Sequence, residues 1–243
     1  SLLAEYRDRL SKGEGRPRSP ATVVRYMAAL SHAFTIAVKE WEWIDDSPLR
    51  RVLKPKEPRG RVRFLSDDER KILLVSCKQN KAQYLYPLVV LALSTGARRG
   101  ELLGLTWGDI DLKRKVAILH KTKNEERRAL PLAGHALDCV EKLAEIRRID
   151  TNLLFPDETG KKPVEIRPAW EKVLKEARLK DFRFHDLRHS AASYLAMNGA
   201  SLAEIAEVLG HKTLQMVKRY SHLSEQHTAD VVSRMNKKIF GGR

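Results

Sequence analysis

The chain has 243 residues, of which 42% are hydrophobic and 32% are charged. This length and composition are sufficient for one large domain, or for a large domain with a small one attached, and they exclude a largely disordered chain. Lys and Arg number 46 against 31 Asp and Glu, so the net charge is +15. This excess favours a polyanionic partner, which is DNA, RNA or an anionic membrane surface.

The longest apolar run, YLYPLVVLALS, is about half the length that a membrane-spanning helix requires, and it predicts a buried helix with Pro87 in its first turn. No N-terminal stretch has the layout of a secretory signal. The two cysteines, Cys77 and Cys139, are too few for a disulfide scaffold and predict reduced core thiols in a cytoplasmic protein. The chain starts with Ser1 rather than Met, which favours a trimmed fragment.

A helical pattern covers the first part of the chain. Ser19 is a predicted N-cap, with Pro20 at the first helical position. Apolar side chains then recur at helical intervals at Val23, Met27, Leu30, Phe34 and Val38. We expect a small all-helical domain of roughly 50 residues, whose thin core leans on lost N-terminal residues or on a partner such as DNA.

A basic linker follows this helical region. Between Arg50 and Arg63 there are seven basic residues and one acidic residue, and two prolines and a glycine exclude a continuous helix. The segment is either a solvated tether or a strap whose cations lie along a phosphate backbone. The predicted DNA-contacting cations are Lys54, Lys56, Arg59, Arg61 and Arg63.

The rest of the chain predicts a larger, mainly helical domain with one small antiparallel sheet. Ser66 and Glu69 form a capping-box pattern that opens a helix, and residues 86–94 follow as the buried helix, which Thr95 and Gly96 end. Val116–His120 and Ala129–Leu132 alternate as short strands around the polar loop Lys121–Arg128, which is typical of a hairpin. From residue 132 onward the pattern is helical again, apart from the loop around FPDETGKKP.

Polar residues stand at helix ends in the last third of the chain. His185 and Arg188 are three apart near the start of a helix, so their side chains share a face. Another helix begins with a capping box and is ended by Gly210, which presents His211 just past the terminus. We interpret the remaining histidines as ordinary surface or partly buried groups: His32, His120, His135, His189, His222 and His227.

Two alternatives compete with a reactive site in this region. His189 is four residues after His185 and shares its face, so it rivals His185 for any role there. The helix–turn–helix pattern of residues 187–209 is also typical of a DNA-reading motif without catalysis.

Four boxes, TGARRGELLGL, HDLRHS, LGH and RYSHL, occur in order, with a hairpin lysine between the first two. In these boxes the chain resembles the tyrosine recombinases, also called phage integrases, along almost its whole length. The resemblance implies the catalytic set Arg98, Lys123, His185, Arg188, His211 and Tyr220. Lys121 is the alternative lysine, but counting back from Pro131 favours Lys123, and Glu101 matches a buttressing acid.

The resemblance further implies a site-specific recombinase or integrase of a phage or mobile element. Tyr220 would attack a backbone phosphate and leave a 3′-phosphotyrosyl link, without a metal or other cofactor. The partners would be a double-stranded DNA recombination site, three further protomers in a homotetramer on DNA, and DNA-bending accessory proteins, with no membrane. The alternatives are strand passage by a type IB topoisomerase and a non-catalytic helix–turn–helix DNA-binding protein.

Residue types in the implied site suit this reaction. Arg98 and Arg188 would clamp the non-bridging oxygens, and His185 and His211 would donate hydrogen bonds to them. One of these histidines would accept the tyrosine proton, with His185 favoured over His211. Lys123 would protonate the leaving 5′ oxygen.

The expected domains are a partial core-DNA-binding domain at 1–53, a linker at 54–64 and a catalytic domain with a tail helix at 65–243. The chain departs from the family pattern at its N-terminus, where we expect no arm-binding domain before residue 1 and a first helical domain shorter than a complete core-binding domain.

Overall fold

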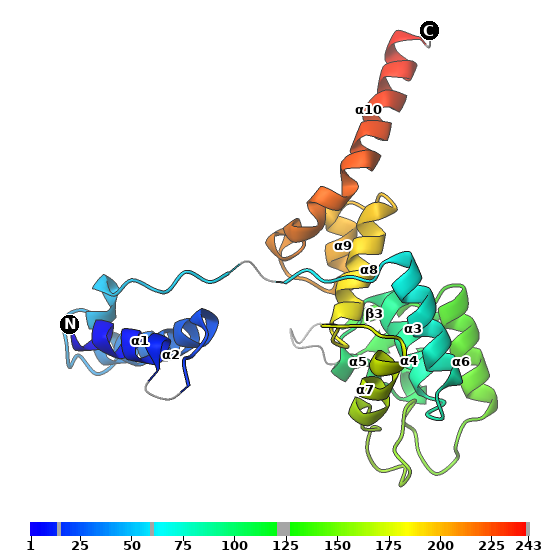
Figure 1. Cartoon of the computed structure of the whole chain (residues 1–243), viewed down its shortest axis with the longest axis horizontal. Helices are drawn as coiled ribbons and strands as arrows, with labels where there is room; N and C mark the ends of the chain where they lie inside the picture. The colour runs from blue at the N-terminus through cyan, green and yellow to red at the C-terminus, as the bar shows by residue number, and fades with distance from the viewer. Residues whose placement is uncertain (14–15, 59–60, 121–126, 242–243) are drawn as a thin grey trace. The chain divides into compact units, whose positions relative to one another are not determined.

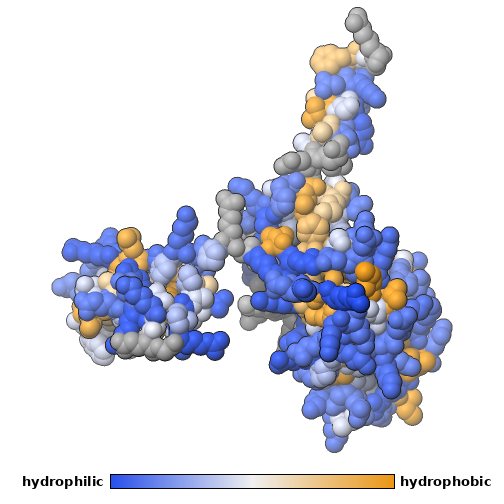
Figure 2. Space-filling model, viewed as in Figure 1, coloured by the Kyte–Doolittle hydropathy of each residue, from blue (hydrophilic) through white to orange (hydrophobic). Residues whose placement is uncertain are grey.

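The computed structural model describes residues 1–13, 16–58, 61–120 and 127–241, with the side chains of residues 224–227 outside the description. The chain divides into two compact units, an N-terminal unit of residues 1–61 and a C-terminal unit of residues 62–243. Figure 1 shows them from blue to cyan and from cyan to red. The face in Figure 2 is mostly hydrophilic, as the large share of charged residues predicts.

Two helices form most of the N-terminal unit: α1 (Leu2–Lys12) and α2 (Pro20–Lys39), followed by the 3-10 helix η1 (Pro48–Arg51). Ser19 caps α2 as predicted, because its side chain accepts from the main-chain N–H of Thr22. The buried apolar residues here are few: Val23, Met27 and Ala37. Of the helices in the described ranges, α2 alone is long and apolar enough to cross a membrane. This is weak evidence for a membrane span, because the core helix of a soluble protein passes the same test.

The C-terminal unit is mainly helical with one small sheet, which confirms the predicted fold class. Its first elements are α3 (Asp67–Gln79), α4 (Leu85–Thr95), α5 (Arg99–Leu103), η2 (Trp107–Asp109), β1 (Ile110–Asp111), β2 (Val116–Leu119) and β3 (Arg128–Pro131). The later ones are α6 (His135–Glu145), α7 (Arg167–Glu176), α8 (Asp186–Met197), α9 (Leu202–Leu209), η3 (Leu214–Met216), η4 (Lys218–Ser224) and α10 (Glu225–Phe240).

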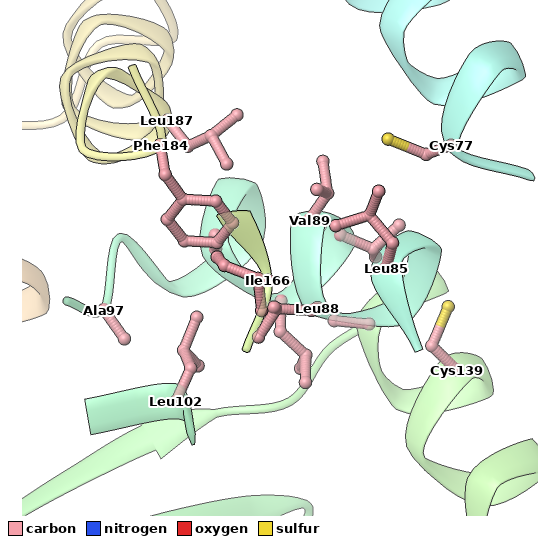
Figure 3. Packing of buried hydrophobic residues seen from close by; sticks show 14 of the residues in the cluster. Cys77, Leu85, Leu88, Val89, Ala97, Leu102, Cys139, Ile166, Phe184 and Leu187 are labelled. Carbon is pink, nitrogen blue, oxygen red and sulfur yellow. The ribbon is translucent and has the colours of Figure 1, made fainter. Parts of the chain in front are cut away.

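Helix α4 is the centre of the main core. It is apolar on nearly all sides, and it packs against α3, α6 and α8. Figure 3 shows side chains of α4 between α3, α6 and α8, with these residues labelled around them: Cys77, Cys139, Ile166, Phe184 and Leu187. Both cysteines are buried and free, as predicted. This core fixes the ends of α4 and α8, where the predicted site residues lie.

The three strands form an antiparallel sheet in the order β1-β2-β3. Ala117 of β2 pairs with Leu130 of β3, and both side chains are buried. Because side chains alternate along a strand, this register also sets the side on which Arg128 lies. The predicted hairpin is therefore confirmed, with residues 121–126 of its loop outside the described residues.

A second apolar cluster joins α8, α9 and η4. Its buried members are Ala192, Ala196, Ile205, Ala206, Leu209, Val217 and Tyr220. The predicted capping box of α9 is present, since Ser201 accepts from Glu204 N–H and the Glu204 carboxylate accepts from Ser201 N–H. The cluster thus holds the predicted nucleophile, Tyr220, against the helices that carry the predicted arginine and histidines.

Candidate active site

Arg98 stands between two helices. Helix α4 ends at Gly96, whose left-handed φ of 60° closes the helix, with its N–H bonded to the oxygen of Ala92. Arg98 then caps α5: its main-chain N–H donates to Glu101 Oε2 at 2.8 Å, and its Nη1 donates to Glu101 Oε1 at 2.6 Å. Because one carboxylate holds both the backbone and the guanidinium, Arg98 has a fixed direction while its side chain stays 24% exposed.

A second arginine, Arg128 at the start of β3, shares that carboxylate. Its Nη2 donates to Glu101 Oε2 and its Nη1 to the main-chain oxygen of Val208, both at 2.9 Å. Burial lowers the pKa of Arg128, Arg98 lowers it further, and Glu101 opposes both effects. The sequence interpretation gave Arg128 no role, although its spacing of two from the buried Leu130 was a signal that it points inward.

Arg188 lies in the first turn of α8 and is 4% exposed. Its Nη1 donates to the oxygen of Gly96 and its Nη2 to the oxygen of Leu209, both at 2.6 Å. Burial and the charges of Arg98 and Arg128 lower its pKa to about 10, so the guanidinium remains cationic at neutral pH. Arg188 therefore joins the end of α4 to the end of α9.

The C-terminal end of α9 receives both buried arginines. Carbonyls at a helix C-terminus lack intrahelical partners and carry the negative end of the helix dipole, so the oxygens of Val208 and Leu209 attract guanidinium groups. Gly210 then ends the helix with a left-handed φ of 63°. His211 follows directly, its N–H bonded to the oxygen of Ala206 at 2.8 Å, which confirms its predicted place just past the terminus.

The charges of four arginines act on His211. Burial lowers its pKa to about 4, and the charges of Arg188, Arg98, Arg128 and Arg219 act in the same direction. The imidazole is therefore neutral at pH 7. Its Nδ1 is buried and makes no hydrogen bond to the described residues. Since buried polar atoms are normally hydrogen-bonded, this nitrogen is a candidate contact for a ligand.

Tyr220 lies on η4 and is only 2% exposed. Its Oη lies 2.6 Å from Nδ1 of His189, within hydrogen-bond distance. Burial raises the pKa of Tyr220, and the nearby cations Arg219 and Arg188 lower it in part. The phenol is therefore protonated at neutral pH.

His189 lies between His185 and Tyr220. The rings of His185 and His189 are perpendicular, with centroids 5.3 Å apart. Burial lowers the pKa of both histidines, to about 4 for His189, where His185 adds to the effect. The sequence interpretation placed His189 among the ordinary histidines while naming it as the rival of His185. The spacing of four between them was the signal for this contact.

Five of the six predicted reactive side chains gather in this region. The charges of Arg98 and Tyr220 act on Arg188, and those of Arg98 and Arg188 act on His211. The five residues are Arg98, His185, Arg188, His211 and Tyr220. The predicted general acid Lys123 and its alternative Lys121 lie outside the described residues.

Arg63, predicted as part of the basic strap, is engaged inside the C-terminal unit. Its guanidinium donates to Glu69 at 2.9 Å and lies over the ring of Phe182, 5.3 Å from the centroid. The other predicted strap cations belong to the N-terminal unit: Lys54 and Lys56 are exposed, Arg61 is half-buried, and Arg59 is outside the described residues.

In the arginine cluster, which we define as Arg98, Arg128 and Arg188, the first two pair with the carboxylate of Glu101, and Arg188 donates to main-chain oxygens. Buried charge is costly unless it is compensated, so the excess positive charge predicts an anionic ligand. Planar guanidinium groups match the oxygens of a phosphate. Within the described ranges, no group of three or more His, Cys, Asp and Glu side chains is placed to hold a metal ion.

Fold and site together define a helical protein in which a tyrosine lies beside an anion-binding cluster of arginines and histidines. The phage integrase family model matches residues 63–227. The integrase of Salmonella phage P22 is 31% identical over 238 residues, covering 93% of this chain and 60% of that protein. Tyrosine recombinase XerC of Thermodesulfovibrio yellowstonii is 31% identical over 228 residues, covering 88% and 75%. The chain belongs to the phage integrase family of tyrosine recombinases.

Other relatives and solved structures agree with this assignment. A shufflon-specific DNA recombinase of Escherichia coli is 35% identical over 226 residues, covering 91% of this chain and 57% of that protein. This chain thus spans about 60% of the length of the first relatives that it matches. The integrase of transposon Tn1549, solved with a circular intermediate DNA, has a TM-score of 0.79 at 21% identity, covering 96% of this chain and 84% of that one. At this identity the likeness establishes the fold.

Proposed function

We propose that this chain is a site-specific DNA recombinase that cleaves and rejoins DNA strands through Tyr220. The observation that carries the proposal is the burial of Tyr220 next to His189, where the charges of Arg219 and Arg188 act on it. Relatives named as an integrase and as a DNA recombinase support DNA as the substrate. So do similar structures that contain DNA, including XerH recombinase bound to its difH substrate, with a TM-score of 0.76 at 24% identity, covering 96% of this chain and 71% of that one.

In the proposed first step, the Oη of Tyr220 attacks one backbone phosphate. A phosphodiester resists attack because it is anionic and its alkoxide is a poor leaving group. Arg98 and Arg188 would contact the two non-bridging oxygens and neutralise charge that develops in the transition state. His185 and His211, both neutral, would donate N–H groups to the same oxygens.

The leaving group is the 5′ oxygen of the DNA, which departs as a hydroxyl. Lys123 is the proposed donor of its proton, because it stands on the hairpin between β2 and β3. The product is a 3′-phosphotyrosyl ester, which is about as reactive as the diester that formed it. A 5′-hydroxyl of a second strand therefore reverses the step without any cofactor.

Exchange between two duplexes requires four cleavages, so we propose four protomers on DNA. The last helix, α10, supports a contact between protomers, because its apolar side chains are 43–76% exposed: Val231, Val232, Met235, Ile239 and Phe240. Apolar atoms along this helix are visible in Figure 2. Sedimentation of DNA complexes with and without residues 226–243 checks this. If the same assembly forms with and without residues 226–243, α10 does not take part in the contact between protomers.

The decisive test of the proposed function is covalent capture. The protein is incubated with nicked suicide duplexes from the ends of candidate elements, and SDS-resistant adducts are digested and mapped by mass spectrometry. We expect a 3′-phosphate on Tyr220, and no adduct with Tyr220→Phe. Tight, salt-sensitive DNA binding without any adduct would favour a non-catalytic DNA-binding protein.

The products of the reaction distinguish a recombinase from a topoisomerase. Recombined duplexes would support recombination, whereas relaxed circles alone would support strand passage by a topoisomerase. We also propose an origin in a phage or mobile element, action in the cytoplasm, and assistance from proteins that bend the recombination site. Reconstitution of recombination with purified components, with and without a DNA-bending protein, tests that last assignment.

A further inference from the structure

The hydroxyl of Tyr220 contacts a side chain to which the mechanism above gives no role. Nδ1 of His189 lies 2.6 Å from the Oη of Tyr220, and α8 and η4 bring the two together across 31 positions of sequence. Tyr220 is 2% exposed, so this contact is shielded from bulk water, where a hydrogen bond is weaker. A nucleophile and a base within hydrogen-bond distance, with the base oriented by a third group, is the arrangement that activates hydroxyl nucleophiles.

We propose that His189, rather than His185, accepts the phenol proton of Tyr220 during strand cleavage. This inference rests on the proposed function. As the bond between Oη and phosphorus forms, the proton passes from Oη to Nδ1 of His189. The bond between phosphorus and the 5′ oxygen breaks at the same time, and that oxygen takes a proton from the general acid proposed above. In religation the 5′-hydroxyl attacks phosphorus and returns its proton to that general acid, the bond between Oη and phosphorus breaks, and Nδ1 returns its proton to Tyr220.

His185 is placed for a different task. It is only partly buried, it precedes α8, and within the described part of the chain it makes no hydrogen bond to Tyr220. Its ring lies edge-on to that of His189 at a centroid distance of 5.3 Å. His185 therefore restricts the orientation of His189 and leaves the contact with Oη to it.

The electrostatics of the pair favour activation by substrate. Burial lowers the pKa of His189 to about 4, so the ring is neutral, and with its proton on Nε2 it accepts the phenol hydrogen at Nδ1. Burial raises the pKa of Tyr220, so the proton stays on the phenol before DNA binds. A phosphodiester held by the arginine cluster brings a negative charge that stabilises an imidazolium, and the phenol becomes acidic as Oη bonds to phosphorus.

The test compares His189→Asn and His189→Ala with the unsubstituted chain in single-turnover cleavage of a suicide duplex. Asn keeps a hydrogen-bonding group near the position of Nδ1 but takes no proton. A second duplex carries sulfur in place of the scissile 5′ oxygen, so its leaving group needs no acid. Each variant is also made with a fluorinated, more acidic tyrosine at position 220. His135→Gln is the matched control, because it removes an imidazole that lies 2.7 Å from another tyrosine hydroxyl, that of Tyr86.

We expect His189→Asn to cleave both duplexes about 10²-fold more slowly, within the usual range for loss of a general base. Fluorotyrosine should recover at least tenfold of this loss and change the unsubstituted chain little, and His135→Gln should cleave normally. Cleavage by folded His189→Asn at the unsubstituted rate, or no recovery with fluorotyrosine, would overturn the inference. If the unsubstituted chain forms no adduct at all, the proposed function fails and this inference fails with it.

Discussion

Nη2 of Arg128 lies 2.9 Å from Oε2 of Glu101, and this buried ion pair joins strand β3 to helix α5. The other carboxylate oxygen holds Arg98 at 2.6 Å. The side chain of Glu101 is 7% exposed, so one nearly buried carboxylate sets the direction of two guanidinium groups. The position of the hairpin and the position of Arg98 are therefore coupled through Glu101.

Glu101→Gln should weaken both the fold and the activity. It leaves Arg98 and the nearly buried Arg128 without their carboxylate partner, and breaking a buried pair in this way costs about 3–5 kcal/mol in the free energy of unfolding. Urea unfolding measures the loss. The control is Glu204→Gln, which alters an exposed carboxylate in the same type of cap and should cost much less. Equal losses in the free energy of unfolding for the two variants would show that the ion pairs of Glu101 with the arginines add nothing to the stability that its helix cap provides.

Arg188→Lys should reduce strand cleavage by about 10²–10³-fold, the usual cost of removing one donor from a charge-stabilising site. A lysine has one ammonium group and cannot reach the oxygens of Gly96 and Leu209 as a planar fork does. One of these buried carbonyls would lose its partner, which costs about 1–3 kcal/mol in stability. Single-turnover cleavage and thermal unfolding measure the two effects. Unchanged cleavage in a folded variant would contradict the role given to Arg188.

Gly96→Ala should destabilise the protein through overpacking as well as through backbone strain. Gly96 has φ 60° and ψ 15°, so alanine introduces strain of about 1–2 kcal/mol there, whereas Gly134, with φ 50° and ψ −129°, tests backbone strain without a steric contact. A Cβ at Gly134 meets nothing within 4 Å, whereas one at Gly96 would overlap Cδ2 of Leu209. We expect an extra loss of about 1–3 kcal/mol at Gly96 from overpacking. Thermal unfolding of the two variants side by side decides whether this space is as tight as the structure indicates.

The free energy of unfolding should fall as the pH drops from 6.5 to 4. The pKa of His211 and of His189 is about 4 in the folded chain against an ordinary value of 6.5, so between these values the unfolded chain binds more protons. Because each ring is partly exposed, solvent screening reduces the effect to about 1–2 kcal/mol per histidine. His211→Gln should flatten the profile measured by urea unfolding across this range. An unchanged slope would show that His211 is not held neutral.

Much of the fold was predictable because its signals are local. The capping boxes at Ser66 and Ser201, and the glycine stops at Gly96 and Gly210, depend on a few neighbouring residues and are confirmed. These same stops place Arg98 and His211 at helix ends. The alternation of the hairpin strands likewise depends on neighbours, and it predicted β2 and β3 to within one residue at each end.

The contacts that complete the site were less predictable, because they join distant segments. His189 and Tyr220 are 31 positions apart, and Arg128 reaches Glu101 across 27 positions and Val208 across 80. Periodicity shows which face of an element is buried but not which other element covers it. Arg63 illustrates the same limit, since a run of basic residues gives no sign that one of them pairs with Glu69.

The two arginines at the end of α9 bind main-chain oxygens, so the site depends on the length of this helix more than on its side chains. An α-helix turns by about 100° per residue, so one inserted residue would rotate the oxygens of Val208 and Leu209 away from Arg128 and Arg188. Substitutions on the exposed face, at Glu207 for example, leave both oxygens in place. Sequence drift on the exposed face of α9 is therefore compatible with the site, whereas a single insertion or deletion within the helix is not.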